Sequence, residues 1–352
     1  MSARRTGSGG LLQTLRGPNG EGVLALIIIV LVVVMAILSP AFFDVRTLFS
    51  ILRSVIVPLI FALAVLLIII SGGIDVSFAA IAVFAGYTTV FLLTQGSLDP
   101  GLIVIMLLAI VIGAALGAVN GIVIARFRLP TLIVTLGTQG IFKGVLLAYV
   151  GSRYIAEIPD SLASLSTAYI ISIESAKAYL HVLVIPAALL AVGMWALLTR
   201  TMFGRGVYAI GGDAESARRA GIPVMRYQVM LYMLAGMLAA TGGIFYVILN
   251  RNADPQVLVG DELDIIAAVV LGGASIFGGR GSVLGTVLGV FLVQLINNSL
   301  LLLGVPTAWQ RTAVGLLLVI GVGVQAISAR RQAKRVKAND EAIDIDAKEV
   351  AS

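Results

Sequence analysis

The sequence predicts an all-α, polytopic membrane protein whose main solvent is the lipid bilayer, and three observations support that fold class. Of the 352 residues, 59% are apolar and 12% are charged, and the mean hydropathy is +1.06; soluble domains are about 45–50% apolar and 25% charged. Apolar runs of about 18 or more residues recur along the chain, and each can cross a hydrocarbon core of about 30 Å as a helix. These runs are continuously apolar rather than alternating, which excludes a membrane β-barrel.

The apolar runs are separated by polar, glycine or proline residues and predict about ten transmembrane helices. In chain order they cover residues 22–38, 53–70, 76–94, 101–125, 131–150, 179–199, 227–249, 263–277, 283–303 and 307–327. If the N-terminus is cytoplasmic, most of the 24 Lys and Arg residues lie on the cytoplasmic side. Because cytoplasmic loops are enriched in basic residues, we expect both termini inside.

Three parts follow from this pattern: a cytoplasmic N-terminal segment (1–21), a transmembrane domain (22–328) and a cytoplasmic tail (329–352). The tail changes from basic to acidic without a periodic apolar face, so we expect it to be mostly disordered. Two connections are long enough to carry function, residues 151–178 outside and residues 200–226 inside. The outer one either packs as a surface excursion or contacts an external partner.

The two halves of the chain resemble each other weakly. Gly73–Asp75, before an apolar run that ends at Gly86, is echoed by residues 261–264 before the run that ends at Gly272. Five spans in each half would make the copies inverted in the membrane, a layout that places a solute path near their interface. Chance similarity between Gly- and Ala-rich segments is the alternative explanation.

Several functional classes are excluded by the residue content. There is no cysteine and His181 is the one histidine, so we expect no metal site, and His181 is expected to be structural. Neither a G-x-S-x-G motif nor a phosphate-binding G-x-x-x-x-G-K-[ST] loop occurs, so this chain is not expected to be an enzyme, and any ATP hydrolysis belongs to another chain. The net charge of +6 reflects residues that flank the spans rather than a nucleic-acid surface.

Polar side chains within the apolar spans are candidates for lining a solute path. Each needs a partner in hydrocarbon, which is either another helix or a polar solute. Asp75 and Ser77 precede the third predicted span, so Asp75 either caps that helix or takes part in gating. The candidate path residues are Asp75, Ser77, Asn120, Thr135, Thr138, Gln139, Gln294, Asn297, Asn298 and Gln310.

The cytoplasmic loop 200–226 contains a pattern typical of a short, capped helix. Asp213 is expected at the N-cap, Glu215 in the first turn and Arg218 in the last turn, with Gly221 and Pro223 ending the helix. A small helix exposed at the cytoplasmic face is suited to docking a partner protein. The alternative is an interfacial helix on lipid headgroups, which its mostly alanine apolar face disfavours.

At this loop the sequence resembles the permeases of bacterial ATP-binding-cassette (ABC) importers for monosaccharides and autoinducer sugars, within the branched-chain amino-acid permease superfamily. The resemblance covers nearly the whole chain in six ordered pieces. They are SGGIDVS at 71–77, Asn120-Gly121, LPTLIVTLGT at 129–138, the loop from Gly204 to Gly221, IAAVVLGGASIFGGRGSVLG at 266–285 and NSLLLLGVPTAWQRTAVG at 298–315.

The resemblance implies a permease domain in the bacterial inner membrane that pairs with a second permease copy. It also implies an ATPase subunit, which uses ATP and Mg and docks on the cytoplasmic loop, and a periplasmic solute-binding protein. The implied docking residues are Gly204, Arg205, Tyr208, Gly211, Gly212, Asp213, Glu215, Ala217, Arg218 and Gly221. Two residues depart from the family pattern: Asp213 stands where Asn is usual, and Phe78 stands where a small residue is usual.

The function expected from this resemblance is import of a monosaccharide or sugar-like solute, without a cofactor bound in this chain. Branched-chain amino acids or nucleosides are the alternative solutes, because the same architecture serves them. An ion-coupled secondary transporter is the rival class, but such proteins place carboxylates or histidines in mid-span, and most carboxylates here lie at span ends or in loops.

Overall fold

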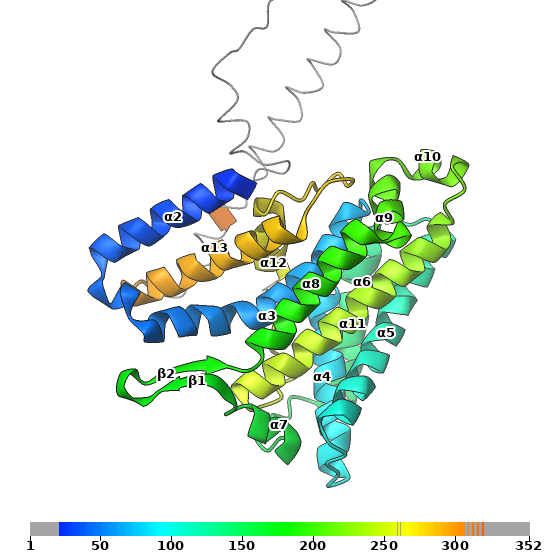
Figure 1. The fold of residues 1–352 in the computed structure, drawn as a ribbon. Coiled ribbons are helices and arrows are strands. Elements are labelled where there is room, and N and C mark those ends of the chain that lie inside the picture. The colour runs from blue at the N-terminus through cyan, green and yellow to red at the C-terminus, as the bar shows by residue number, and fades with distance from the viewer. Residues whose placement is uncertain are drawn as a thin grey trace, which may run out of the picture.

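The chain forms a bundle of long helices with a short β-hairpin at one end (Figure 1). The computed structural model describes residues 21–258, 260 and 262–306, and positions 309, 312, 315, 316 and 319. The N-terminal segment 1–20, the tail 329–352, most of the predicted span 307–327 and Gln310 lie outside the described residues.

Seven described helices are long and apolar enough to cross a membrane, and an eighth crossing results if the bent pair α8 (Val184–Arg200) and α9 (Met202–Gly212) is one span. The two helices of this pair meet at 73°. The seven are α2 (Glu21–Leu38), α3 (Val45–Ile70), α4 (Phe78–Gln95), α5 (Leu102–Phe127), α6 (Thr131–Val150), α11 (Val224–Asn250) and α13 (Val283–Leu302). The chain is therefore a multi-pass membrane protein.

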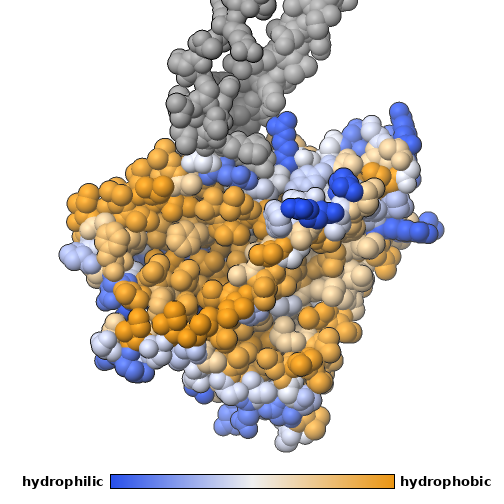
Figure 2. All heavy atoms as spheres, in the orientation of Figure 1, coloured by the Kyte–Doolittle hydropathy of each residue, from blue (hydrophilic) through white to orange (hydrophobic). Residues whose placement is uncertain are grey.

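An apolar surface band covers the middle of the bundle (Figure 2). Hydrophilic residues gather beyond it at two ends, one formed by α9 and α10 (Ala214–Arg219) and the other by the hairpin and α7 (Asp160–Leu165). We call these the α10 end and the hairpin end. Helix α3 runs through the middle, where all residues from Ile56 to Ile70 except Pro58 are buried.

Residues 151–178 include a strand of a short β-hairpin, which corrects the prediction that the fold is all-α. Strand β1 (Tyr169–Ile173) pairs antiparallel with β2 (Ala178–His181), across the short 3₁₀ turn η2 (Glu174–Ala176). Because β2 uses the first residues of the predicted span 179–199, helix α8 begins later, at Val184. A second 3₁₀ turn, η1 (Pro40–Phe43), links α2 to α3.

The predicted span 263–277 is also corrected, because its helix is short. Helix α12 (Glu262–Leu271) has 10 residues, about 15 Å at 1.5 Å per residue, which is half a hydrocarbon core. The helix ends at Leu271 and is followed by Gly272 and Gly273. Gly273 has a φ of +91°, a conformation that favours glycine and ends helices. Residues 272–282 continue without regular helix as far as the start of α13.

Helices α5 and α11 approach so closely that only glycine fits between them. A Cβ on Gly117 would lie 2.1 Å from the carbonyl oxygen of Tyr232, and one on Gly236 would lie 2.1 Å from that of Gly113. Small residues replace the missing hydrophobic drive between helices in lipid by allowing backbone contact. The small-residue stripe of α5 is thus a packing surface.

We predict that Gly117→Ala destabilises the bundle, because the added methyl group must push α5 away from α11. Overpacking of this kind costs about 1–3 kcal/mol. Gly140→Ala is the matched control, since nothing lies within 4 Å of a Cβ there. Thermal unfolding of both variants in mild detergent checks this: Gly117→Ala should melt lower than the unmodified protein, and equal melting of the two variants would refute the packing role.

Candidate functional site

Helix α9 is fixed at the α10 end by a cap and by two glycines. The Thr201 hydroxyl accepts a hydrogen bond from the Gly204 amide at 3.1 Å, which satisfies one free donor of the helix start. A Cβ on Gly204 would lie 2.2 Å from the carbonyl oxygen of Leu198, and one on Gly206 would lie 2.3 Å from the ring of Tyr227. The helix therefore sits directly on the ends of α8 and α11.

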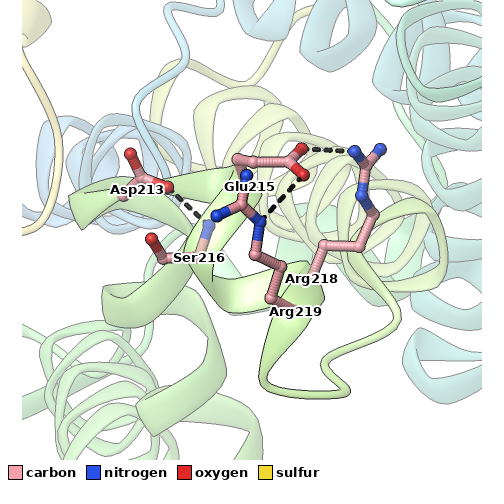
Figure 3. A network of polar contacts seen from close by, with 5 residues as sticks. All are labelled: Asp213, Glu215, Ser216, Arg218 and Arg219. Carbon is pink, nitrogen blue, oxygen red and sulfur yellow. Dashed lines mark hydrogen bonds and ion pairs between the residues drawn. The ribbon is translucent and has the colours of Figure 1, made fainter.

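Helix α10 has the ends that the sequence predicted (Figure 3). The Asp213 carboxylate accepts a hydrogen bond from the Ser216 amide at 2.5 Å, and the Glu215 carboxylate pairs with Arg218 and, at 3.4 Å, with Arg219. At the other end Gly221 has a φ of +86°, and the Ile222 amide donates to Ala217 O in a Schellman motif. The capped-helix prediction is confirmed.

The charged side chains of α10 face solvent, while Ala217 is buried beneath them. Arg205, Gly212, Asp213, Glu215, Arg218 and Gly221 are exposed, and Tyr208 and Gly211 are half-buried. The hydrogen bond from the Ser216 amide lowers the pKa of Asp213, so the carboxylate cap is charged throughout the neutral range. The α10 end thus presents an exposed cluster of both signs of charge.

The end of α9 contacts the end of α3 and the non-helical segment around Gly279, and its last glycines do so through backbone atoms. A Cβ on Gly211 would lie 1.7 Å from Ile70 O and 2.6 Å from the Gly279 nitrogen, while Gly279 N donates to Ile70 O at 2.8 Å. The Tyr208 hydroxyl also donates to Gly281 O at 2.8 Å. We call this meeting point of residues 70–72, 211–212 and 278–281 the glycine junction.

Asp75, Ser77 and Asn120 form one buried hydrogen-bond chain. The Asn120 amide donates to Ser77 Oγ at 2.7 Å, and Ser77 Oγ donates to Asp75 Oδ1 at 2.6 Å. Asp75 Oδ1 also accepts from the Ser77 backbone amide at 2.7 Å, directly before α4. The N-cap of α4 is Ser77, which makes no side-chain cap hydrogen bond, so the expectation that Asp75 caps this helix is corrected. Asp75 binds the residue that precedes the helix, and its part in gating stays a prediction.

The non-helical backbone of residues 71–77 is satisfied by side chains of α6. Ile74 N donates to Thr131 Oγ1 at 3.0 Å, and Thr135 Oγ1 donates to Ile74 O at 3.2 Å. Thr138 bonds within its own helix, to Thr135 O. Of the predicted path residues on α6, both threonines thus have structural partners.

Gln139 joins α6 to the start of α12. Its Nε2 donates to Glu262 Oε1 at 2.7 Å, and the other Glu262 oxygen accepts from the Gly260 amide at 2.7 Å. Glu262 is 7% exposed, so the two hydrogen bonds satisfy a buried carboxylate. This contact fixes the loop that precedes α12.

His181 is structural, as its isolation in the sequence suggested. Its Nδ1 accepts from the Leu183 amide at 3.2 Å, which leaves Nε2 to donate to Ser166 O at 3.2 Å. Burial lowers the pKa of this imidazole. The neutral ring therefore closes the hairpin onto α8.

A cavity of about 590 Å³ lies toward the hairpin end, between α3, α11, α12, α13 and the start of α4. Gln294 and Asn297 from α13 line it, whereas the neighbouring Asn298 packs between helices and donates to Ser54 Oγ and Gln294 O. The structure thus separates the predicted path residues into the chain around Asp75, the α6 set and the cavity pair. The other polar lining residues are Ser50, Arg53, Ser54, Tyr246, Asn250 and Asp264.

Sequence reasoning missed Arg53, Asn250 and Asp264 in this cavity. Arg53 and Asp264 stood at the ends of predicted spans, and their charge was the signal that could have marked them, since ionisable groups within membrane segments are costly. The Arg53 guanidinium donates to Leu249 O at 2.7 Å, which holds it beside the last turn of α11. Phe61 and Phe78 also line the cavity, with ring centroids 5.5 Å apart.

A multi-pass bundle with a polar cavity toward one end and an exposed, charged helix at the other defines a membrane transport protein. Its family follows from comparison with known proteins. Residues 47–322 match the model of the family described as branched-chain amino acid transport system / permease component, and the chain belongs to that family.

Curated relatives cover most of this chain. It is 36% identical over 83% of its length to the ribose import permease protein RbsC of Bacillus subtilis, covering 88% of that protein. It is 38% identical over 87% of its length to the autoinducer 2 import system permease protein LsrC of Klebsiella pneumoniae, covering 86% of that protein. The Escherichia coli K12 RbsC is 31% identical over 84% of this chain and 90% of its own length. No solved structure matches the chain.

We predict that Asp213→Ala speeds amide exchange at Ser216, whereas Asp213→Asn, which can still cap, leaves it nearly unchanged. Since hydrogen bonding lowers the folded-state pKa of Asp213, its stabilisation is present above the ordinary Asp pKa and is lost only as the pH falls through the lowered value. Protection should therefore stay constant through the neutral range. Hydrogen exchange of the full chain, read by mass spectrometry, checks both points; equal exchange in the two variants would contradict the cap.

Proposed function

We propose that this chain is the membrane-spanning permease of a bacterial ATP-binding-cassette importer that carries a monosaccharide or sugar-like solute. Its family is that of transport-system permease components, and its curated relatives are named for the import of ribose and autoinducer 2. The observation that carries the proposal is the α10 end, where the exposed charged helix α10 directly follows α9, and the last residues of α9 contact the segments around Ile70 and Gly279 through their backbone.

In this proposal the α10 end is cytoplasmic and docks a separate ATPase subunit, which uses ATP and Mg. The exposed Asp213, Glu215 and Arg218 offer both signs of charge to that subunit. The glycine junction leaves no compressible side chain between α9 and Ile70, so a displacement of α9 moves the end of α3. Gly72 and Asp75 follow within the same segment, and Asp75 is joined to Ser77 and Asn120.

Transport then follows an alternating-access scheme. ATP binding closes the ATPase pair, α9 transmits the motion, and residues 71–77 and 272–282 change their arrangement around the cavity. Rearrangement is easier there than in a helix, because neither segment has a continuous helical ladder: side chains of α6 hold Ile74, and scattered backbone bonds hold residues 275–280. No covalent chemistry is assigned to this chain.

The wider assembly is part of the same proposal. The chain would sit in the bacterial inner membrane with an even number of crossings, two inverted halves and both termini cytoplasmic. A second permease copy, identical or related, would pair with it. A periplasmic solute-binding protein would deliver solute at the hairpin end, where Asp99 ties α7 down by accepting from the Ser161 amide at 2.8 Å.

An amino acid is the second candidate solute, favoured by two observations. The family description names branched-chain amino acids, and the cavity holds one cation and one anion, Arg53 and Asp264, which suit a zwitterion. A sugar is preferred as the solute because the curated relatives at 31–38% identity are named for ribose or autoinducer 2.

The test is co-purification followed by reconstitution. The tagged chain, extracted in mild detergent, should bring an ATPase whose activity rises when a sugar-loaded periplasmic binding protein is added. Liposomes that contain this assembly should then take up the sugar only with ATP. A chain that comes alone and moves solute along an ion gradient would replace the proposal with a secondary transporter, and stimulation by a leucine-loaded binding protein would replace the sugar.

We predict that Gly211→Ala uncouples ATP hydrolysis from transport, whereas Gly212→Ala does not. A methyl group at Gly211 would overlap Ile70 O, while nothing lies within 4 Å of a Cβ at Gly212. The measurement is the number of solute molecules imported per ATP hydrolysed in liposomes. A fall of about tenfold is expected for Gly211→Ala, corresponding to about 1.4 kcal/mol of lost coupling, and normal coupling would show that the junction does not transmit motion.

We predict that Glu215→Arg also weakens coupling, because it replaces two ion pairs with repulsion against Arg218 and Arg219 and reverses a charge on the docking surface. Glu215→Gln is the control, since it removes the charge without creating repulsion. Both variants should insert into the membrane normally. Retention of the ATPase on the tagged permease is the readout, and full retention by Glu215→Arg would exclude α10 as the docking element.

A further inference from the structure

Two adjacent amides on α13 have opposite environments. Asn298 donates to Ser54 Oγ at 3.0 Å and to Gln294 O at 2.8 Å, so it is fully engaged between helices. Asn297 lines the cavity, and its Oδ1 is buried without a hydrogen-bond partner among the residues that the structure describes. This oxygen is covered rather than open to the cavity, so the Asn297 amide must rotate before a solute can reach it. A buried amide oxygen without a partner costs about 1–3 kcal/mol, so a hydrogen bond from a group in the cavity to the rotated amide would be favoured.

Gln294 presents a second amide to the same space. It lies three residues before Asn297, on the same face of α13, and lines the cavity. Its side-chain amide has no hydrogen-bond partner within the described part of the chain, although its backbone oxygen binds Asn298. Together these two side chains offer both donors and acceptors at one wall.

Two aromatic rings also line the cavity. Phe61 comes from α3 and Phe78 from the first turn of α4, and their rings lie 5.5 Å apart at 51°. Phe78 is 1% exposed and follows the Asp75–Ser77 segment directly in the chain. This is the residue that departs from the family pattern, and an aromatic wall suits the C–H face of a sugar ring.

The charges that line the cavity balance. Arg53 supplies one positive charge and Asp264 one negative charge, while the remaining polar groups are amides and hydroxyls. A neutral wall of this kind does not favour a net anion or cation. A volume of about 590 Å³ is within the range of small-molecule sites, about 300–1,000 Å³, which are mostly apolar with a few placed polar groups.

We propose that this cavity is a solute-binding site within a single permease chain, which takes an uncharged monosaccharide through hydroxyl contacts with Asn297 and Gln294 and ring contact with Phe61 and Phe78. The inference rests on the importer function proposed above and adds a stopping place for the solute within one protomer. Asn297 receives a sugar hydroxyl once its amide has rotated.

The absence of cysteine from the chain allows a direct test with single-cysteine variants. Ser50→Cys, at a lining position outside the proposed contacts, is introduced into the full importer in intact cells and labelled with a membrane-impermeant thiol reagent. Asn250→Cys, also at a lining position, serves as a second reporter in case the first variant is unstable. Thr286→Cys, fully buried and away from the cavity lining, is the control.

Labelling is repeated with D-ribose, D-xylose, L-rhamnose or L-leucine in the medium. We expect both cavity cysteines to react, Thr286→Cys to stay unlabelled, and at least one sugar to slow the cavity reaction about tenfold, as nine-tenths occupancy would. Protection by leucine instead of any sugar would overturn the solute class. Labelling that no solute slows, or equal labelling of all three variants, would overturn the site.

The outcome is separable from that of the importer proposal. If liposomes of the assembled transporter import one of these sugars with ATP while that sugar protects neither cavity cysteine, the site fails and the importer function stands. If a sugar protects Ser50→Cys but no ATPase co-purifies with the chain, the site stands and the energy source is the part that fails.

Discussion

The structure depends on one constraint, that backbone groups within the bundle must find partners where water is absent. Two segments break the helical ladder, residues 71–77 and 272–282, and their amides and carbonyls are bound by protein atoms. Ile74 is held by Thr131 and Thr135, and Ile70 O receives the Gly279 amide. The non-helical backbone is therefore stabilised by side chains of α6 and by glycines that permit direct backbone pairing.

The same constraint connects the two ends of the molecule. At the glycine junction the backbone of α9 lies directly against the backbone of residues 70–72, so no side chain separates the two elements there. The segment that follows carries Asp75 and leads into Phe78, whose ring forms a wall of the cavity. A charged surface helix and a polar cavity, which lie far apart, are thus linked by a short stretch of chain that lacks a helical ladder of its own.

Polar residues of one chemical kind serve different purposes according to their neighbours. Asn120 and Asn298 bind other helices, Gln139 secures the buried Glu262, and Asn297 keeps an oxygen without a partner in the described structure beside a cavity. The expected path set therefore holds members that bind other helices and members that line the cavity. In the sequence each of these residues is an amide in an apolar segment, so only their hydrogen-bond partners in the structure distinguish the two groups.

The sequence by itself determined the class of the protein and the residues at which its short helix α10 begins and ends. Continuous apolar runs require membrane helices, and Asp213, Gly221 and the arginines between them specify a capped helix through contacts within a few residues. Tertiary structure decided what depends on distant contacts: the hairpin that uses the start of the predicted span 179–199, the early end of α12, and the meeting of Arg53 with Asp264 in one cavity. Arg53 and Asp264 are more than 200 positions apart in the chain, and no local pattern records which helices lie side by side.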